Sequence, residues 1–310
     1  MEVKEPLEVD SETLRKIQLL ELGILKDIDD ICRKHGLHYT LCGGSMLGAV
    51  RHGGIIPWDD DIDITMLRED YERFFEICET ELDTDKYFAQ TMDTDPNYRL
   101  IYGRILLKGT KFVRAGQEHM KARNGLFVDI FPRDGESDIF FIMQLQSILA
   151  KLMRKILYSP VGVLKSKSIC GRWGFRILMR FPRTSAFRIL KIISFLNFGR
   201  ETKRVACWGL MSNSERRKLE LGKKAYKEYK KKIRSLPFQE RKERKERNKG
   251  IYREWFYRTE DLPFEDMKAM VTSAWDTWLT WNYDDYMTLP PVEKRKMHQT
   301  VSYIDFGEYV

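Results

Sequence analysis

The stretch LCGGSMLGAVRHGGIIPWDDDIDIT, residues 41–65, holds four aspartates within five positions: Asp59, Asp60, Asp61 and Asp63. Two unit charges about 4 Å apart repel by about 4 kcal/mol at the effective dielectric of a protein surface. A folded chain therefore keeps such a cluster only where protons, basic side chains or a divalent cation neutralise it. Mg²⁺ prefers oxygen ligands and is typically held by carboxylates together with substrate phosphates. The cluster indicates metal-assisted phosphate chemistry with Mg²⁺ or Mn²⁺.

The segment that begins at Asp61 alternates acidic and β-branched residues, which is typical of a strand with one polar face. Residues two apart in a strand share a face and lie about 6.5–7 Å apart, so Asp61 and Asp63 are expected to point into one site. Asp129 stands between apolar residues of a second expected strand, where a carboxylate is costly unless it is paired or coordinates metal. We predict Asp61, Asp63 and Asp129 as metal ligands and catalytic carboxylates, and supporting or merely polar roles for the other two aspartates.

Three other interpretations of the cluster fit the sequence less well. A solvated acidic loop fits poorly, because Ile62 and Ile64 make the segment strand-like. A calcium loop would place its first three ligands on aspartates and its twelfth on Asp70, but Ile64 stands at the sixth position, where the turn requires glycine. A DxD metal site of a glycosyltransferase leaves the preceding Gly-Gly-Ser turn, residues 43–45, unexplained.

The composition favours a soluble globular protein, with 43% hydrophobic and 32% charged residues among 310. Five scattered cysteines, never spaced as CxxC, argue against a disulfide framework and a zinc knuckle. The polar N-terminus lacks the apolar core of a signal peptide, and no run of about 18 uncharged apolar residues occurs. A cytoplasmic location is the default expectation.

Helical and strand patterns alternate in the first part of the chain, which predicts an α/β (α+β) fold whose mixed sheet is flanked by helices. The expected helices there are residues 11–36, 46–51 and 68–82, and the expected strands are 37–42, 61–65, 98–107, 110–114 and 125–131. The strands 98–107 and 110–114 are expected to pair around Lys108 and Gly109. Pro132 to Gly135 should close the last strand. Helical patterning follows over 137–236, with breaks near residues 160, 182 and 199, and helices are expected around 264–281.

The net charge of +8 is unevenly distributed, because Ile139 to Arg200 contains twelve Lys and Arg and no Asp or Glu. Basic helices with aromatic residues can lie in a membrane interface, and residues 139–200 are a candidate for such peripheral contact. An ordinary helical subdomain with a basic outer face is an equally good interpretation. Nucleic-acid binding has no recognised motif in its support, so no nucleic-acid partner is expected.

The run at residues 41–64 closely resembles the signature of the LicD family. Two further blocks agree: residues 125–135, GLFVDIFPRDG, and residues 283–291, YDDYMTLPP, followed by Glu293, Arg295 and His298. The resemblance implies a nucleotidyltransferase-like core. It covers both ends of the chain, which suggests a catalytic core over 1–136, a helical basic insertion over 137–250 and a C-terminal segment, 251–310, that packs back on the core.

The resemblance implies transfer of phosphocholine, or a related phospho-alcohol, from CDP-choline or a similar donor to a cell-surface glycan or its lipid-linked precursor. It places Gly43, Gly44 and Ser45 at the turn that contacts the nucleotide phosphates, Asp61 and Asp63 as the metal-binding pair, and Asp129 as the third carboxylate. Departures exist: Ser45 stands where threonine is common, Asp284 where glycine is common, and Arg104 where lysine is common.

Several further side chains are candidates around the phosphates. Arg51, Arg104 and Lys108 could clamp phosphate oxygens, and His52 could be a general base at neutral pH. Asp129 or Asp60 could equally accept the proton of the acceptor hydroxyl. Trp58 is a weak candidate for cation–π contact with a choline headgroup.

Two other functions remain open at this point. A nucleotidyltransferase could form a CDP-activated alcohol or sugar from CTP. A non-catalytic protein could retain the fold and bind a membrane surface.

Overall fold

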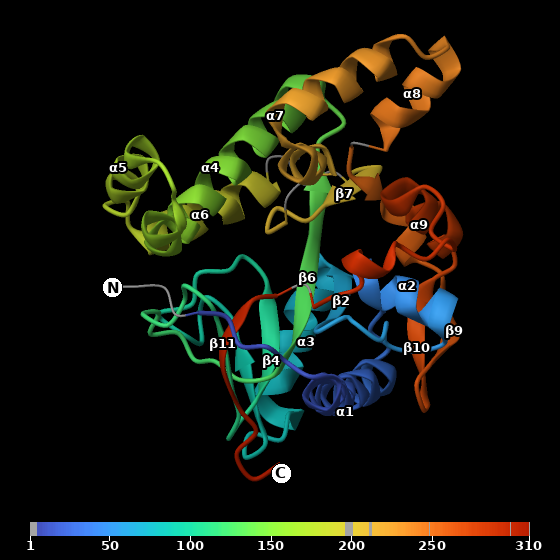
Figure 1. The fold of residues 1–310 in the computed structure, drawn as a ribbon. Coiled ribbons are helices and arrows are strands. Elements are labelled where there is room, and N and C mark those ends of the chain that lie inside the picture. Colours follow the sequence, from blue (N-terminus) through green and yellow to red (C-terminus); the bar gives the residue numbers. More distant parts are fainter. Residues whose placement is uncertain (1–4, 196–200, 211–212, 248, 298, 310) are drawn as a thin grey trace.

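The computed structural model describes residues 5–195, 201–210, 213–247, 249–297 and 299–309. A mixed sheet occupies its centre (Figure 1). Its strands, in spatial order, are β1 (Tyr39–Leu41), β2 (Ile62–Leu67), β6 (Phe127–Glu136), β4 (Gly103–Leu107) and β3 (Tyr87–Gln90). β7 (Arg204–Ala206) pairs with the end of β6, and β8 (Ile251–Tyr252) pairs with β7. β2 and β6 run parallel and the other pairs are antiparallel, so the predicted mixed α/β architecture is confirmed.

Helices α1 (Ser11–His35) and α3 (Arg68–Glu81) form where their periodicity predicts them, and both contact β2 and β6. The carboxylate of Asp10 caps α1 by accepting a hydrogen bond from the backbone of Thr13 at 2.7 Å. Gly36 ends the helix with a φ of 63°, a left-handed conformation that glycine adopts at little cost. Local signals were therefore sufficient for these two helices.

The predicted turn at residues 43–45 is instead the first turn of helix α2 (Gly43–His52). Gly43 has a φ of 57°, so the chain changes direction at that residue and the helix follows at once. The expected helix over 46–51 is therefore confirmed, but it begins three residues earlier.

Two predictions for the strands were wrong. β6 does not end at Phe131 but continues through Pro132 to Glu136. Proline donates no backbone hydrogen bond, and β4 pairs with β6 only as far as Gly103 opposite Ile130, so the proline lies beyond that ladder. The expected hairpin around Lys108 is also absent from the described pairs.

β5 (Lys111–Arg114) pairs with β11 (Val301–Asp305), which lies nearly two hundred residues further along the chain. β4 is already paired on both sides, by β3 and β6. β5 therefore forms a separate two-stranded sheet with β11.

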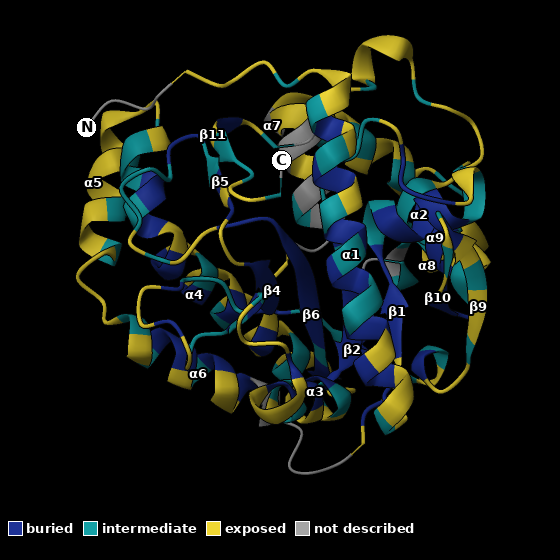
Figure 2. Ribbon diagram, turned by 90° about the horizontal axis from the view of Figure 1, so that it is seen from below, coloured by how far each residue is buried: buried dark blue, intermediate teal, exposed yellow. Residues whose placement is uncertain are grey.

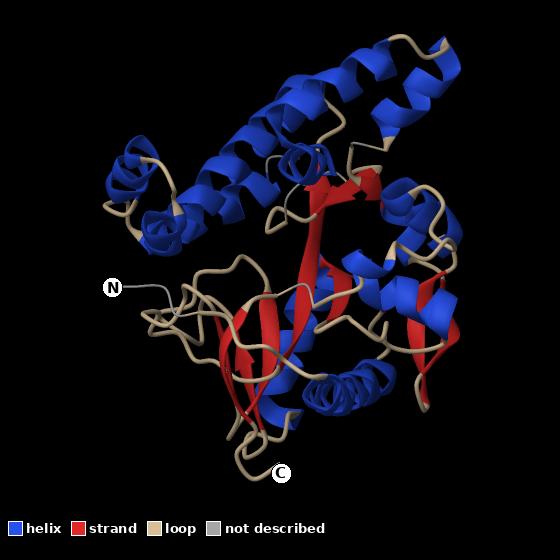
Figure 3. Ribbon diagram, viewed as in Figure 1, coloured by secondary structure: helices blue, strands red, loops and turns tan. Residues whose placement is uncertain are grey.

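The middle of the chain is mainly helical, as predicted (Figure 3). Its helices are α4 (Phe140–Lys165), α5 (Ile169–Leu178), α6 (Arg183–Phe195), α7 (Asn213–Arg234) and α8 (Phe238–Glu246). The predicted break near Pro182 separates α5 from α6, and the one near Gly199 lies outside the described residues.

The expected break near Pro160 is wrong, because α4 continues through that residue. Proline cannot donate to the carbonyl group four residues before it. Here that carbonyl belongs to Ile156, and the hydroxyl group of Ser159 donates to it at 2.6 Å. The side chain thus replaces the missing backbone donor and lets the helix continue.

The C-terminal part differs from prediction at residues 264–272, where a hairpin replaces the expected helix. β9 (Thr259–Phe264) and β10 (Met267–Thr272) pair across Glu265, whose φ of 58° makes the turn, and α9 (Trp275–Tyr283) follows. The hydroxyl groups of Tyr39 and Thr40 accept hydrogen bonds from the backbone of β10 at 3.2 and 2.8 Å. Contacts with β1 therefore override local helical spacing. Two short 3₁₀ helices, η1 (Arg253–Phe256) and η2 (Val292–Lys294), complete the segment.

Two hydrophobic cores are present in the described structure. The larger one joins α1, α3 and both faces of the central sheet, where buried residues cluster (Figure 2). The smaller one lies among α4 and α6 and includes Met153, Phe187 and Trp208. We call α4, α5 and α6 the helical lobe. Their separate core agrees with a helical unit in the middle of the chain, while the boundaries 137 and 250 stay a prediction. None of the described helices combines the length and apolar character needed to cross a bilayer.

Candidate active site

Asp59, Asp60 and Asp61 form a tight group immediately before β2. One carboxylate oxygen from each lies within 4.8 Å of the others. Asp60 is buried, and the other two are half-buried. Burial raises the pKa of Asp59 to about 8, with a further contribution from the charges of Asp61 and Asp60. The three side chains together supply hard oxygen donors of the kind that divalent cations prefer.

The pairing of β2 with β6 places Asp63 directly beside Asp129. Burial raises the pKa of Asp63 well above its ordinary value, and the charges of Asp61 and then Asp129 raise it further. The three carboxylates predicted from the sequence are therefore brought together. The Oδ1 atom of Asp63 is buried and finds no hydrogen-bond partner among the described residues. A buried carboxylate oxygen without a hydrogen-bond partner is stabilised by a proton or by a cation.

Arg104 on β4 stands opposite Asp129 on β6. Its Nε donates to Oδ1 of Asp129 at 2.8 Å, and its Nη2 lies 2.7 Å from the same oxygen. The guanidinium group also lies over the ring of Phe127, 4.0 Å from the centroid. Burial still raises the pKa of Asp129, although Arg104 and then Arg114 oppose that effect. Arg104 is thus beside the carboxylates, where its charge partly neutralises Asp129.

The first turn of α2 faces the aspartates. A Cβ atom at Gly44 would lie 2.1 Å from Oδ2 of Asp59, so any other residue there would displace that carboxylate. The Oγ of Ser45 accepts a hydrogen bond from the backbone of Asp63 at 2.8 Å. No side chain of the described residues caps the helix at Cys42. Uncapped amide groups at a helix N-terminus are donors for phosphate oxygens.

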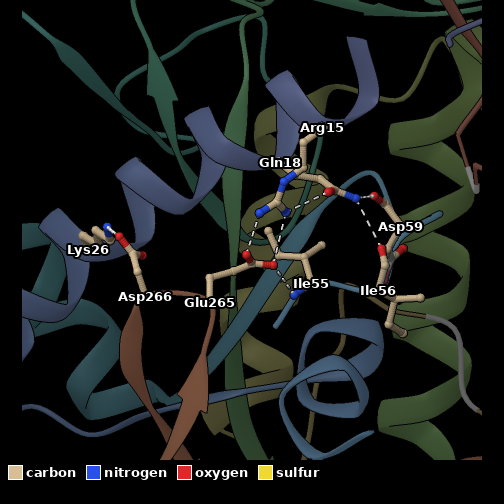
Figure 4. A network of polar contacts seen from close by, with 8 residues as sticks. All are labelled: Arg15, Gln18, Lys26, Ile55, Ile56, Asp59, Glu265 and Asp266. Carbon is tan, nitrogen blue, oxygen red and sulfur yellow. Dashed lines mark hydrogen bonds and ion pairs between the residues drawn. The ribbon is translucent and has the colours of Figure 1, made fainter. Parts of the chain in front are cut away.

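Helix α1 and the β9–β10 turn hold the loop that carries the aspartates (Figure 4). The amide group of Gln18 donates to the carbonyl oxygens of Ile56 and Asp59 at 3.2 and 2.8 Å. Glu265 accepts from the backbone of Ile55 at 2.9 Å and pairs with Arg15 at 2.6 Å. The loop is therefore anchored by elements from both ends of the chain.

Two residues near the cluster were not predicted from the sequence. Glu21 on α1 is fully buried, and neither of its carboxyl oxygens has a hydrogen-bond partner in the part of the chain that the structure describes. Burial, followed by the charges of Asp61 and Asp60, raises its pKa well above the ordinary value. Gln299 donates from its backbone to Asp60 at 3.1 Å and from its side chain to Asp61 at 2.7 Å. A glutamate on the apolar face of α1 was a detectable signal, whereas nothing in the sequence connects Gln299 with the cluster.

Three of the predicted residues lie apart from the aspartates. His52 is exposed at the far end of α2, edge-on to Trp58 at 6.0 Å between ring centroids. Desolvation, followed by the charge of Arg51, lowers its pKa. Arg51 donates to the carbonyl oxygen of Tyr286 at 2.9 Å. Lys108 is engaged with the carbonyl oxygen of Thr84, beyond the end of β4.

These placements separate the predicted residues into two sets. One set converges on the cluster: the aspartates, Gly43, Gly44, Ser45 and Arg104. The other set lies at the far end of α2, where His52 contacts Trp58 and Arg51 contacts the C-terminal segment. His298 lies outside the described residues, but Arg295 from the same block lies over the ring of Trp58, 5.5 Å from the centroid.

A cavity of about 670 Å³ lies between α4 and the segment that includes β5, and Arg104 and Phe127 line it. Its lining is largely apolar and also includes seven basic side chains: Arg99, Arg104, Arg114, Arg123, Lys151, Arg154 and Lys155. Glu215 pairs with Lys151 and Arg154 at 2.8 and 2.7 Å. Tyr98 and Gln90 also line it, and the buried hydroxyl group of Tyr98 and the buried Oε1 of Gln90 each lack a hydrogen-bond partner within the described residues. The cavity is suited to an anionic ligand. The clustered aspartates line neither this cavity nor a larger one of about 890 Å³.

A mixed sheet with carboxylates on adjacent strands, beside an uncapped helix N-terminus, defines a site of the nucleotidyltransferase class. Residues 36–146 match the sequence model of the LicD/FKTN/FKRP nucleotidyltransferase domain. This match, together with the relative described next, supports a member of the LicD family and a transferase.

Two relatives show how far the similarity extends. The chain is 29% identical over 297 residues to the lipopolysaccharide cholinephosphotransferase LicD of Haemophilus influenzae, which covers 92% of this chain and 96% of that protein. It is 60% identical over 35 residues to the ribitol 5-phosphate transferase FKRP of Homo sapiens, which covers 11% of this chain and 7% of FKRP. The first similarity spans nearly the whole chain, and the second is confined to a short segment.

Proposed function

We propose that this protein transfers phosphocholine, or a related phospho-alcohol, from a CDP-linked donor to a hydroxyl group of a glycan or a lipid-linked glycan precursor. The convergence of Asp61, Asp63 and Asp129 beside the N-terminus of α2 is the observation that carries the proposal. The end-to-end similarity to a lipopolysaccharide cholinephosphotransferase supports the choice of transferred group.

The residues fit a divalent cation, because they offer carboxylate oxygens of which one, Oδ1 of Asp63, is buried without a partner among the described residues. Asp61, Asp63 and Asp129 would hold Mg²⁺ or Mn²⁺. The chemistry that a bound divalent cation supplies is neutralisation of charge on the phosphate oxygens and on the departing nucleotide.

The protein's own groups would position the donor and move the proton. Backbone amides of Gly44 and Ser45 at the start of α2 would bind phosphate oxygens, and the basic cavity beside Arg104 would hold an anionic part of a substrate. The acceptor oxygen forms a bond to phosphorus as the bond between phosphorus and the CMP oxygen breaks. The hydroxyl proton passes to a carboxylate of the cluster, and burial makes Asp59 more basic than an exposed aspartate. His52 is less suited, because it lies at the other end of α2.

The test is CMP release from a panel of CDP-alcohols, measured with and without a glycan acceptor and with and without Mg²⁺. Asp61→Asn and Asp63→Asn should each lower transfer by roughly a thousandfold, since each removes charge where phosphate must be neutralised. Asp93→Asn is the matched control, because its side chain is 74% exposed and its contact with Lys191 is long, at 3.7 Å. Normal transfer by both cluster variants would refute the catalytic assignment.

A nucleotidyltransferase that makes a CDP-activated alcohol or sugar is the second candidate, favoured by the description of the matched domain. It would release pyrophosphate from CTP rather than CMP from a CDP-alcohol. The same panel, extended to CTP with free alcohols, distinguishes the two reactions.

A further inference from the structure

Helix α5 is unusual because all its residues are described and none is buried. Ile169, Trp173 and Ile177 are exposed to 67%, 59% and 65%. Residues four apart in a helix lie on one face, so these three side chains form a continuous apolar stripe. A soluble protein rarely leaves such a stripe uncovered without a use for it.

A basic row borders that stripe. Arg172 and Arg176 on α5, and Arg180 just beyond it, repeat at the same spacing and are all exposed. The guanidinium group of Arg176 lies over the ring of Trp173, 5.3 Å from the centroid. An apolar stripe next to a row of arginines is the arrangement of helices that lie in the interface of an anionic membrane.

Helix α4 carries a second exposed apolar row and packs against α5. Phe141, Leu145, Ile148 and Leu152 follow each other at helical spacing, and Phe141 is 82% exposed. The contact between the helices is close, because a Cβ atom at Gly162 would lie 2.7 Å from the ring of Phe175. Lys151, Arg154 and Lys155 of the same helix line the basic cavity. α4 thus links the exposed apolar surface of the lobe to the candidate site.

The charge of the lobe selects the kind of partner. Residues 139–200 contain twelve Lys and Arg and not one Asp or Glu, so nothing within the segment opposes an anionic partner. Basic residues near an anionic lipid surface each strengthen binding, and the buried apolar area adds to it.

We propose that the helical lobe docks on an anionic phospholipid bilayer, with the apolar stripe of α5 in the interface and its arginine row against the headgroups. Docking would bring the candidate site to a lipid-linked acceptor, and only this role of the membrane contact rests on the proposed function. Membrane binding itself requires neither donor nor acceptor.

The test is flotation of the full chain with vesicles of phosphatidylcholine alone and of phosphatidylcholine with about 30% phosphatidylglycerol. The protein should float with the anionic vesicles, and binding should weaken as salt screens the arginines. Ile169→Ser/Trp173→Ser/Ile177→Ser should weaken binding at least tenfold, and Arg172→Gln/Arg176→Gln/Arg180→Gln by about fivefold per arginine. All six residues are exposed, so neither variant removes a core contact.

The matched control is Leu7→Ser/Leu19→Ser/Tyr303→Ser, which removes three apolar side chains exposed to between 45% and 50% outside the lobe. It should float as the unaltered protein does. Of the chain's five cysteines, Cys170 on α5 is the exposed one. The fluorescence of a bimane attached to it should therefore be quenched by nitroxide-labelled lipid.

Flotation of the α5 variant to the same extent as the unaltered protein would overturn the proposal. So would a dimer that the α5 variant splits while neither protein binds vesicles, since the stripe would then be an interface between copies. CMP release with a water-soluble acceptor separates the two proposals: the α5 variant should retain it, and Asp63→Asn should lose it while still floating.

Discussion

The aspartate site and the helical lobe break opposite rules of protein structure. At the site, charge lies where it is costly: Asp63, Asp129 and Glu21 are crowded together, and each has a raised pKa. On α5, apolar side chains lie in solvent although a core exists a few residues away on α6. Each departure costs free energy of folding that the rest of the fold must offset, and each therefore indicates a ligand.

The comparison also shows why the two ligands differ. Arg104 neutralises part of the charge at Asp129, and a small cation or protons can neutralise the other crowded carboxylates, so the site selects for charge and size. The lobe presents an apolar stripe and a row of arginines along the exposed helix α5, so it selects for a surface. The predictions below alter each region in turn.

After the aspartate variants described above, the largest effect is expected from Gly44→Ala. The new Cβ atom would fall 2.1 Å from Oδ2 of Asp59, so the carboxylate or the first turn of α2 must move. Transfer should fall by roughly a hundredfold, in line with the cost of misplaced catalytic groups. The matched control is Gly23→Ala in α1, where a Cβ atom meets no described atom within 4 Å and should stabilise the helix by up to about 1 kcal/mol. Steady-state rates and thermal unfolding measure both, and near-normal transfer by Gly44→Ala would contradict this geometry.

Divalent cations should stabilise the protein by neutralising the aspartates. A ligand at a hundred times its Kd adds about 2.7 kcal/mol to the free energy of unfolding. Mg²⁺ or Mn²⁺ should therefore raise Tm, and EDTA should reverse the change. Sodium chloride at matched ionic strength is the control for screening. An equal rise in the Asp61→Asn/Asp63→Asn double variant would locate the cation elsewhere.

With Glu21→Gln, the free energy of unfolding should decrease less steeply as pH rises. The folded-state pKa of Glu21 is raised, so the unfolded chain releases this proton first as pH increases. The folded state then binds more protons, and stability falls as pH rises above the ordinary range of glutamate. The slope from one such group is at most about 1.4 kcal/mol per pH unit.

Urea unfolding in EDTA between pH 5 and 8 measures the difference between Glu21→Gln and the unaltered protein. Glu8→Gln removes an exposed carboxylate and should leave the slope unchanged. Parallel pH profiles for Glu21→Gln and the unaltered protein would show that the buried carboxyl does not titrate as predicted.

The smallest effect is expected within the lobe. Ser159→Ala removes the hydroxyl group that donates to Ile156 at Pro160 and should cost about 1 kcal/mol. Ser147→Ala, on the exposed side of the same helix, should be neutral or slightly stabilising. Urea unfolding distinguishes them, and CMP release should be unaffected by either. Equal stability of the two variants would remove the explanation for the unbroken helix.

Much of the site was visible in the sequence, because its signals were local. Alternation over two residues was sufficient to place Asp61 and Asp63 together, and an aspartate among apolar residues pointed to Asp129. Their roles as ligands stay predictions until tested. Lys108 was predicted as a phosphate clamp from its charge alone. Charge does not indicate that its amino group donates to the carbonyl oxygen of Thr84.

The sequence by itself determined the helices of the core and the positions where charge is costly, because helical hydrogen bonds join residues four apart and burial follows their period. Only the tertiary structure decided that β5 pairs with β11, that Asp63 lies beside Asp129 and opposite Arg104 across it, and that Glu21 and Gln299 meet the same cluster. Pairing between distant segments depends on which partners remain unpaired when the sheet assembles. The local sequence pattern does not indicate which distant strands will pair.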